Sequence, residues 1–245
     1  MIKYYMTEIN SHLDDGFGVT ADSFYKSAEA IKSSEEYDSV FNPQKQLPVL
    51  YLFRHSCELF TKSLILIVHR KLSINFGLNK DQLPNCKTPT IYNNKKNEWV
   101  ELYKCHDVRV LLDYLMKLVD ENKSLLDEMA PEAHWGFDHL NYNDLLVLDK
   151  YDFDSTFLRY PVTRDRGKDR KKETFKRFTS LKKIKRRQGN TGNIILITKD
   201  KNGNFVEGFQ MVDNVLSDLE QSIKEIAKFL NGYHIMTRMT LCEGW

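Results

Sequence analysis

The sequence lacks most of the short motifs that identify metal, nucleotide or membrane proteins. Its four cysteines form no CxxC pair and no HExxH occurs, which argues against a zinc site. The phosphate-binding patterns GxxxxGK[ST] and GxGxxG are also missing. No apolar run approaches the roughly 20 residues of a membrane span, and the N-terminus lacks a signal-peptide core. We therefore expect no metal, no cofactor, no membrane contact and a cytoplasmic location with free thiols.

Acidic residues are scarce in one segment and charge is unevenly distributed. Residues 164–187 hold 13 Lys or Arg against 3 Asp or Glu, a local net charge of +10. Since the whole chain carries +2, the remainder sums to −8 (+2 minus +10). The chain is long enough for one large domain, and its 41% hydrophobic and 12% aromatic content predicts a substantial core.

Hydrophobic periodicity predicts a mainly α-helical protein. The helices expected from apolar spacing and cap residues span about 21–37, with Thr20 as N-cap, then 48–72, 106–122, 141–151 and 212–233. Short helical turns are expected after Pro131. Residues 73–104 are rich in Pro and Asn, and we expect a long irregular loop there.

Residues 162–209 differ from the rest of the chain. After the basic stretch, IILIT and NFVEGF are two β-prone runs that flank an Asn-Gly turn, a pattern typical of a β-hairpin. Thr174 to Phe178 is a candidate third strand. The sequence therefore predicts a helical bundle with a basic β-hairpin insertion before the last helix.

The segment 51–70, YLFRHSCELFTKSLILIVHR, combines an apolar helix with four ionisable side chains. Arg54, Glu58 and Lys62 lie four residues apart and share one face, and His55 is beside them. Because the helix is apolar nearly all round, it should be central in the bundle. Buried charges must pair with one another or serve a ligand, so a structural ion-pair ladder and a functional site are both open.

Three motifs resemble the HEPN superfamily of helical nucleotide- and RNA-binding domains. RHSCELFTKSLI resembles the family's E-L-x-x-K helix, and CHDVRVLL (105–112) resembles its G-H-D-L-x-x-L-L element, with Cys105 in place of glycine. DSTFLRYP (154–161) resembles the R-Y-P element of some members. The motifs occur in the family's order and cover about residues 20–161 and the last helix.

The resemblance implies a single antiparallel HEPN-like helical domain over residues 1–245, with insertions at about 73–104 and 162–209. It also implies a dimer, an association with prokaryotic antiviral defence or toxin–antitoxin systems, and a partner protein encoded nearby. Active members are metal-independent ribonucleases in which an Arg precedes a His by about five residues. No Arg lies five to seven positions before any of the seven histidines here, so that usual arrangement is absent.

A metal-independent ribonuclease site would therefore have to be assembled differently. RNA cleavage needs a proton acceptor, a proton donor and cations for the phosphate. The candidate catalytic residues are Arg54, His55 and His106, with Lys62 and Arg159 as phosphate ligands. Arg159 is also a candidate partner for Glu58. Two further polar residues are candidates for structural roles: Glu58 for ion pairing, and Asp107 for helix capping.

The basic segment interleaves cations with Phe175 and Phe178, which suits phosphate neutralisation and base stacking. A solvated charged face is the alternative. The candidate nucleic-acid ligands there are Lys171, Lys172, Lys176, Arg177, Arg186 and Arg187.

Two functions are therefore expected. The first is an RNA-directed protein acting as a metal-independent endoribonuclease, with RNA or another polyanion as its partner. The second is a non-catalytic module that senses a nucleotide or acts as a scaffold for a partner protein.

Overall fold

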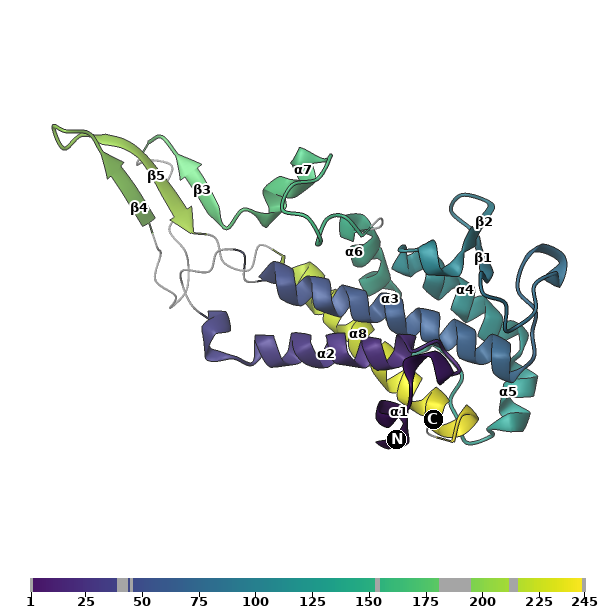
Figure 1. Ribbon diagram of the computed structural model, residues 1–245. Helices are drawn as coiled ribbons and strands as arrows, with labels where there is room; N and C mark the ends of the chain where they lie inside the picture. The colour runs from purple at the N-terminus through teal and green to yellow at the C-terminus, as the bar shows by residue number, and fades with distance from the viewer. Residues whose placement is uncertain are drawn as a thin grey trace.

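The computed structural model describes residues 2–38, 44, 46–152, 155–180, 195–211 and 216–243, and within them the protein is mainly α-helical (Figure 1). The helices are α1 (Ile2–Met6), α2 (Phe17–Lys32), α3 (Gln46–Lys71), α4 (Val108–Glu121), α5 (Lys123–Met129), α6 (Tyr142–Asp152), α7 (Arg166–Asp169) and α8 (Ser217–Leu241). The strands are β1 (Thr90–Asn93), β2 (Glu98–Glu101), β3 (Phe175–Phe178), β4 (Ile195–Lys199) and β5 (Phe205–Met211). Short 3₁₀ turns occur at Ile9–Ser11, Glu35–Asp38, Leu78–Lys80, Leu102–Lys104 and Arg170–Lys172.

Helix α3 is the centre of the bundle, as its apolar pattern predicts. It packs against α2, α4 and α8, and every residue from Ser56 to His69 is buried. Large side chains such as Phe53 and Phe60 are fully buried in its core, where each contributes about 1.5–3 kcal/mol of hydrophobic stabilisation. Burial on all sides explains why polar side chains on this helix need partners from its neighbours.

The predicted start of the first long helix is wrong by four residues. Helix α2 begins at Phe17, after Gly16, whose φ of 78° is the left-handed conformation that glycine adopts easily. The buried carboxylate of Asp14 accepts hydrogen bonds from the backbone N–H groups of Gly16 and Gly18. Thr20 is therefore inside the helix, and its hydroxyl donates to the Gly16 carbonyl oxygen.

Other helix ends also differ from the sequence expectation. Helix α8 continues to Leu241 instead of ending near residue 233: Gly232 does not end it, and Thr237 and Leu241 extend its buried face. The segment 212–215 lies outside the described residues. Helical turns were expected after Pro131. The structure instead has helix α5 before that proline, and residues 131–141 are not helical.

The expected irregular loop 73–104 contains a β-hairpin. Strands β1 and β2 pair antiparallel, with Ile91 opposite Val100 and Tyr92 opposite Trp99. These β-branched and aromatic residues favour strands. The turn between them is closed by the Asn93 carboxamide, which accepts hydrogen bonds from the backbone N–H groups of Lys95 and Lys96. The Asn and Lys residues that suggested a loop are thus the turn of a hairpin.

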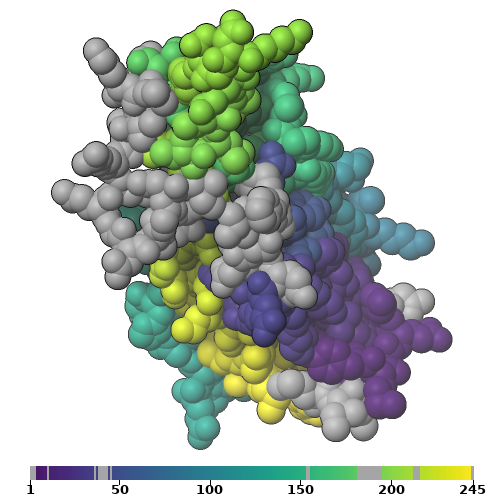
Figure 2. All heavy atoms as spheres, turned by 90° about the vertical axis from the view of Figure 1, so that its left-hand side faces the viewer, coloured from purple at the N-terminus to yellow at the C-terminus, as the bar shows by residue number. Residues whose placement is uncertain are grey.

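A three-stranded sheet with the order β3-β5-β4 lies at one end of the molecule (Figure 1). Strand β5 is antiparallel to both neighbours. In the view from that end, the strands form the upper part of the face, and α2 and α8 the lower part (Figure 2). The sheet has a small core of its own, in which the Phe178 ring is buried against Gly208 and stacks on Phe205.

Candidate functional site

The Glu58 carboxylate is the centre of the polar stripe on α3. Its Oε2 atom accepts from Nη1 of Arg54, one turn earlier. Its Oε1 atom lies 2.9 Å from Nζ of Lys62, one turn later. The exposed fractions of the Arg54, Glu58 and Lys62 side chains are 0%, 1% and 2%. The i, i+4 spacing in the sequence therefore does produce a buried ladder of ion pairs.

A second carboxylate, which sequence reasoning missed, completes this ladder. Oδ2 of Asp152, at the end of α6, lies 3.0 Å from Nε of Arg54, and both side chains are fully buried. Charge counting indicates why it is needed. Arg54 and Lys62 carry two positive charges and Glu58 only one negative charge, and an uncompensated buried charge is strongly unfavourable. That imbalance was the available signal for another acidic residue nearby.

The surrounding cations keep Glu58 ionised. Burial alone would raise the pKa of its carboxyl, but the charges of Lys62 and Arg54 outweigh burial and hold the pKa at about 2. Arg54, Lys62, Glu58 and Asp152 thus form a balanced set of two positive and two negative charges, which we call the buried quartet.

His106 is brought to the buried quartet by the start of α4. Its Nδ1 atom lies 2.9 Å from Oε1 of Glu58, and because that carboxylate is ionised, the imidazole donates. Its backbone carbonyl oxygen accepts from Nη2 of Arg54. The next residue, Asp107, is the N-cap of α4 and accepts from the backbone N–H groups of Arg109 and Val110. Capping is therefore the role that the geometry gives Asp107.

The His106 side chain is 46% exposed. With its Nδ1 proton directed to Glu58, the other ring nitrogen, Nε2, is the one left to act on a bound molecule.

His55 lies on the other side of the same carboxylate. Its Nδ1 atom is 4.0 Å from Oε2 of Glu58, and the ring is 20% exposed. The imidazole stacks on Tyr51, with ring centroids 5.7 Å apart, and meets Phe24 edge-on. Burial lowers its pKa, which favours the neutral ring at neutral pH.

Arg159 lies near His55 and forms no ion pair with Glu58, contrary to one expectation. Its guanidinium bonds the Ser155 hydroxyl at 3.1 Å and is centred 6.0 Å from the Tyr51 ring. The Glu58 carboxylate instead has three closer partners, Arg54, Lys62 and His106. Arg159 is exposed.

Two predicted roles change with these positions. Arg54 and Lys62 were candidates for contacting RNA directly, but both are buried and engaged. Nζ of Lys62 also donates to the Tyr103 carbonyl oxygen at 3.1 Å. Their geometry suits holding Glu58 in place, whereas His55, His106 and Arg159 are the members of the cluster that reach the surface.

The basic segment presents only some of its candidate ligands to solvent. Lys171, Lys176 and Arg177 are exposed, although Arg177 pairs with Glu207 on β5. Lys172 is buried, contrary to its predicted role. Its ammonium donates to the Tyr160 carbonyl oxygen at 2.8 Å and to Asp169.

Phe178, proposed for base stacking, is buried within the sheet. Arg186 and Arg187 lie outside the described residues.

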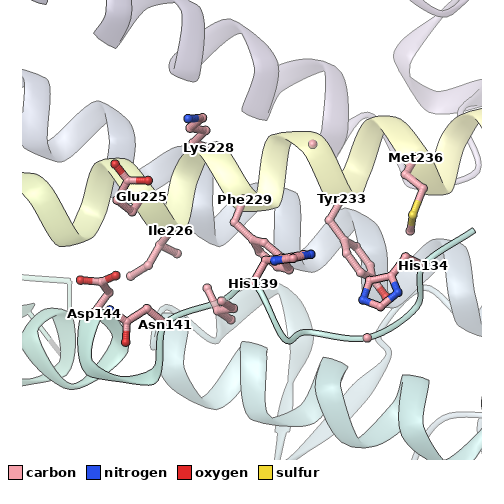
Figure 3. A pocket seen from close by; sticks show the side chains of 13 residues that line it. His134, His139, Asn141, Asp144, Glu225, Ile226, Lys228, Phe229, Tyr233 and Met236 are labelled. Carbon is pink, nitrogen blue, oxygen red and sulfur yellow. The ribbon is translucent and has the colours of Figure 1, made fainter.

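Of two cavities in the protein's surface, the first is lined in part by the basic segment. The first, of about 740 Å³, is bounded by the end of α6 and the chain up to α7, including Tyr151, Tyr160 and Lys168. The other, of about 630 Å³, lies between α8 and the segment before α6. Figure 3 shows His134 and His139 across that second cavity from Phe229 and Tyr233 of α8.

Within the described ranges, no group of three or more His, Cys, Asp or Glu side chains is arranged to hold a metal ion. In the same part of the chain, no helix is both long and apolar enough to cross a membrane. The four cysteines are free thiols.

Comparisons with known proteins identify no relative: no protein-family model matches the chain, and neither a curated protein nor a solved structure matches it.

Proposed function

We propose that the chain is an HEPN-like, RNA-directed protein and acts as a metal-independent endoribonuclease. The observation that carries this proposal is that two imidazoles approach one buried carboxylate: Nδ1 of His106 lies 2.9 Å from Oε1 of Glu58, and Nδ1 of His55 lies 4.0 Å from Oε2. Two partly exposed histidines near one carboxylate, together with Arg159 near His55, would supply the proton acceptor, the proton donor and the phosphate ligand that RNA transesterification needs.

Each group has a distinct role in this mechanism. Neutral His55 accepts the proton of the 2′-hydroxyl as its oxygen attacks phosphorus. His106 delivers a proton from Nε2 to the 5′-oxygen as the P–O5′ bond breaks, and Glu58 stabilises the imidazolium from the other side. Arg159 binds the non-bridging phosphate oxygens, for which its guanidinium offers two donors. The products are a 2′,3′-cyclic phosphate and a 5′-hydroxyl end.

The basic region would hold the rest of the RNA. Under this proposal, the β3-β5-β4 sheet and the chain before it form a basic insertion in an HEPN-like bundle. The exposed cations Lys171, Lys176 and Arg177 support a role in neutralising phosphates.

Cleavage of labelled single-stranded RNA in EDTA tests the proposal. Wild type should cleave, and His55→Ala and His106→Ala should each lower the rate by about 10²- to 10⁴-fold. His139→Ala, which removes an imidazole from the second cavity, is the matched control and should cleave normally. Full activity in both His55→Ala and His106→Ala would overturn the assignment. Arg54→Ala is unsuitable as a catalytic test because it also unbalances the buried quartet.

A second candidate is the non-catalytic module that senses a nucleotide or serves as a scaffold. It is favoured by the balance of the buried quartet, since four charges that neutralise one another also suit a purely structural core. Calorimetric binding of a nucleotide, together with no cleavage of any RNA tested, would support this alternative.

The biological setting belongs to the same proposal. We propose a homodimer that works in the cytoplasm in antiviral defence or a toxin–antitoxin pair, with a partner protein encoded nearby. Light scattering of the purified protein tests the dimer, and co-purification with the product of a neighbouring gene tests the partner.

A further inference from the structure

The cavity at the end of α6 is lined by aromatic rings. Tyr151, Phe157 and Tyr160 contribute their side chains to it. The first two are buried, with their ring centroids 5.7 Å apart, whereas Tyr160 is 49% exposed. An exposed ring at the mouth of a cavity is a surface on which a planar group can stack.

Cations surround these rings. Arg164 and Lys168 line the same cavity, and Arg164 is exposed. Nζ of Lys171 lies 4.8 Å and Nζ of Lys150 lies 5.5 Å from the centre of the Tyr151 ring.

One acidic residue, Asp165, also lines the cavity, and it offsets one of the two positive charges of Arg164 and Lys168. The carboxylate of Asp165 is used as the N-cap of α7, where it accepts from the backbone N–H of Lys168. The cavity thus combines stacking surface with an excess of positive charge, the two features that single-stranded nucleic acid requires.

The cavity and the histidine cluster are linked through neighbouring residues of one loop. Arg159, which lies over Tyr51 beside His55, is followed directly by Tyr160, so the two sites meet at adjacent residues. Burial alone would lower the pKa of Arg159, but a hydrogen bond to the neighbouring Tyr160 side chain outweighs burial and raises it.

The loop that carries both residues is fixed from inside the protein. Oδ1 of Asp152 accepts from the backbone N–H of Phe157 at 2.7 Å, while its other oxygen faces Arg54 of the buried quartet. The buried ammonium of Lys172 holds the Tyr160 carbonyl oxygen at 2.8 Å. Because the backbone of this loop is already held, little of its conformational freedom is lost when a base stacks on Tyr160.

We propose that this cavity is a binding subsite for single-stranded RNA, in which a base stacks on Tyr160 and the phosphates next to it contact Arg164 and Lys168. Arg159 then receives the following phosphate and presents it to His55 and His106. This subsite rests on the proposed RNA-directed function and adds to it the path by which the strand reaches the histidines.

Binding of a strand that cannot be cleaved tests the subsite separately from catalysis. The probe is a fluorescent 2′-O-methyl RNA of about 12 nucleotides, which keeps bases and phosphates but lacks the attacking hydroxyl. In anisotropy titrations, Tyr160→Ala should weaken binding by roughly 5- to 150-fold, the loss expected for one stacked base. Tyr160→Phe should retain wild-type affinity because the ring remains.

The salt dependence tests the role of the two cations. Arg164→Ala and Lys168→Ala should each lower the slope of log affinity against log salt by about 0.7, as expected when one phosphate of a single strand is no longer neutralised. Tyr142→Ala is the matched control, since Tyr142 is an exposed tyrosine (55%) at the other end of α6, and it should bind like wild type.

The outcomes separate the two proposals. Affinity unchanged in Tyr160→Ala, or lowered equally in Tyr142→Ala, would overturn the subsite even if wild type cleaves RNA. A selective loss in Tyr160→Ala would establish the subsite even if wild type cleaves nothing. Equal competition by inorganic phosphate at the same phosphate concentration would also overturn it, because a phosphate-only site needs no stacked base.

Discussion

The Nε atom of Arg54 lies 3.0 Å from Oδ2 of Asp152, and neither side chain reaches solvent. This contact joins the centre of α3 to the last residue of α6. Through the other oxygen of Asp152 it also fixes the backbone of Phe157, two residues before Arg159. One ion pair therefore determines both the balance of the buried quartet and the position of the loop next to the histidines.

Removing the charge of Asp152 should destabilise the fold strongly. Asp152→Asn keeps an oxygen for the Phe157 N–H but leaves the buried cations with only one carboxylate. Breaking one partner of a buried pair costs about 3–5 kcal/mol, a large part of the stability of a domain. Urea denaturation at pH 7 measures the loss.

The control for that measurement is Lys117→Ala, at a surface pair with Glu121 whose side chains are 72% and 59% exposed. This variant should change the free energy of unfolding by at most about 0.5 kcal/mol. If Asp152→Asn lowered the free energy of unfolding by no more than this, the charge balance of the buried quartet would not stabilise the fold.

Acid should destabilise the protein through His69. This buried imidazole contacts the Ile74 carbonyl oxygen through Nδ1 and the Tyr114 hydroxyl through Nε2, which is the pattern of a neutral ring. Burial lowers its pKa from 6.5 to about 4. Between these values the unfolded chain binds a proton that the folded chain does not, so stability falls as the pH falls.

The expected loss at His69 is about 2 kcal/mol between pH 7.5 and pH 5. Chemical denaturation across this range should show a smaller decline in His69→Gln, which cannot titrate. The remaining decline comes from other buried histidines, including His55 and His234, whose pKa values burial also lowers. Identical curves for wild type and His69→Gln would contradict the prediction.

Exposing His55 should raise its pKa. The stacked Tyr51 ring helps to cover the imidazole, and burial is the main cause of its lowered pKa. In Tyr51→Ala, water reaches the ring, so the pKa should move up toward the ordinary value of about 6.5. Proton NMR titration of the His55 ring measures the shift.

The His139 ring signals provide the internal reference for that titration and should be the same in both proteins. A His55 titration that does not move in Tyr51→Ala would show that covering by this ring does not set the pKa.

Two glycines inside helices should respond oppositely to alanine. At Gly232 of α8, a Cβ atom would meet nothing within 4 Å, so Gly232→Ala should stabilise by roughly 0.5–1 kcal/mol through helix propensity. At Gly18 of α2, the Cβ atom would lie 2.3 Å from Nε2 of His234. Gly18→Ala should therefore destabilise, by about 1–3 kcal/mol, and thermal unfolding of the two variants compares them directly.

The sequence was sufficient to predict contacts between residues of the same helix. The i, i+4 stripe predicted the Arg54–Glu58–Lys62 ladder, because helical spacing alone decides which side chains share a face. It also predicted the central position of α3. The first turn of α4 was predicted for the same reason, since Asp107 caps the residues that follow it directly.

Contacts between distant segments were the part that spacing could not predict. Nothing near Asp152 indicates that it meets Arg54, since the two are joined only by the packing of α6 against the bundle. Lys172 was assigned to the surface because its neighbours are basic, yet one lysine in that run is folded inward to hold Tyr160. The hairpin β1–β2 was missed because its turn is rich in Asn and Lys, residues that also occur in irregular loops.

The buried quartet has a consequence for how the chain folds. Its members come from α3 and α6, so a partly assembled bundle without α6 would leave Arg54, Lys62 and Glu58 with one excess positive charge in the interior. Such an intermediate is several kcal/mol less stable than one with balanced charges. Docking of α6 and desolvation of α3 must therefore occur together, and we expect the helical body to fold in one cooperative transition.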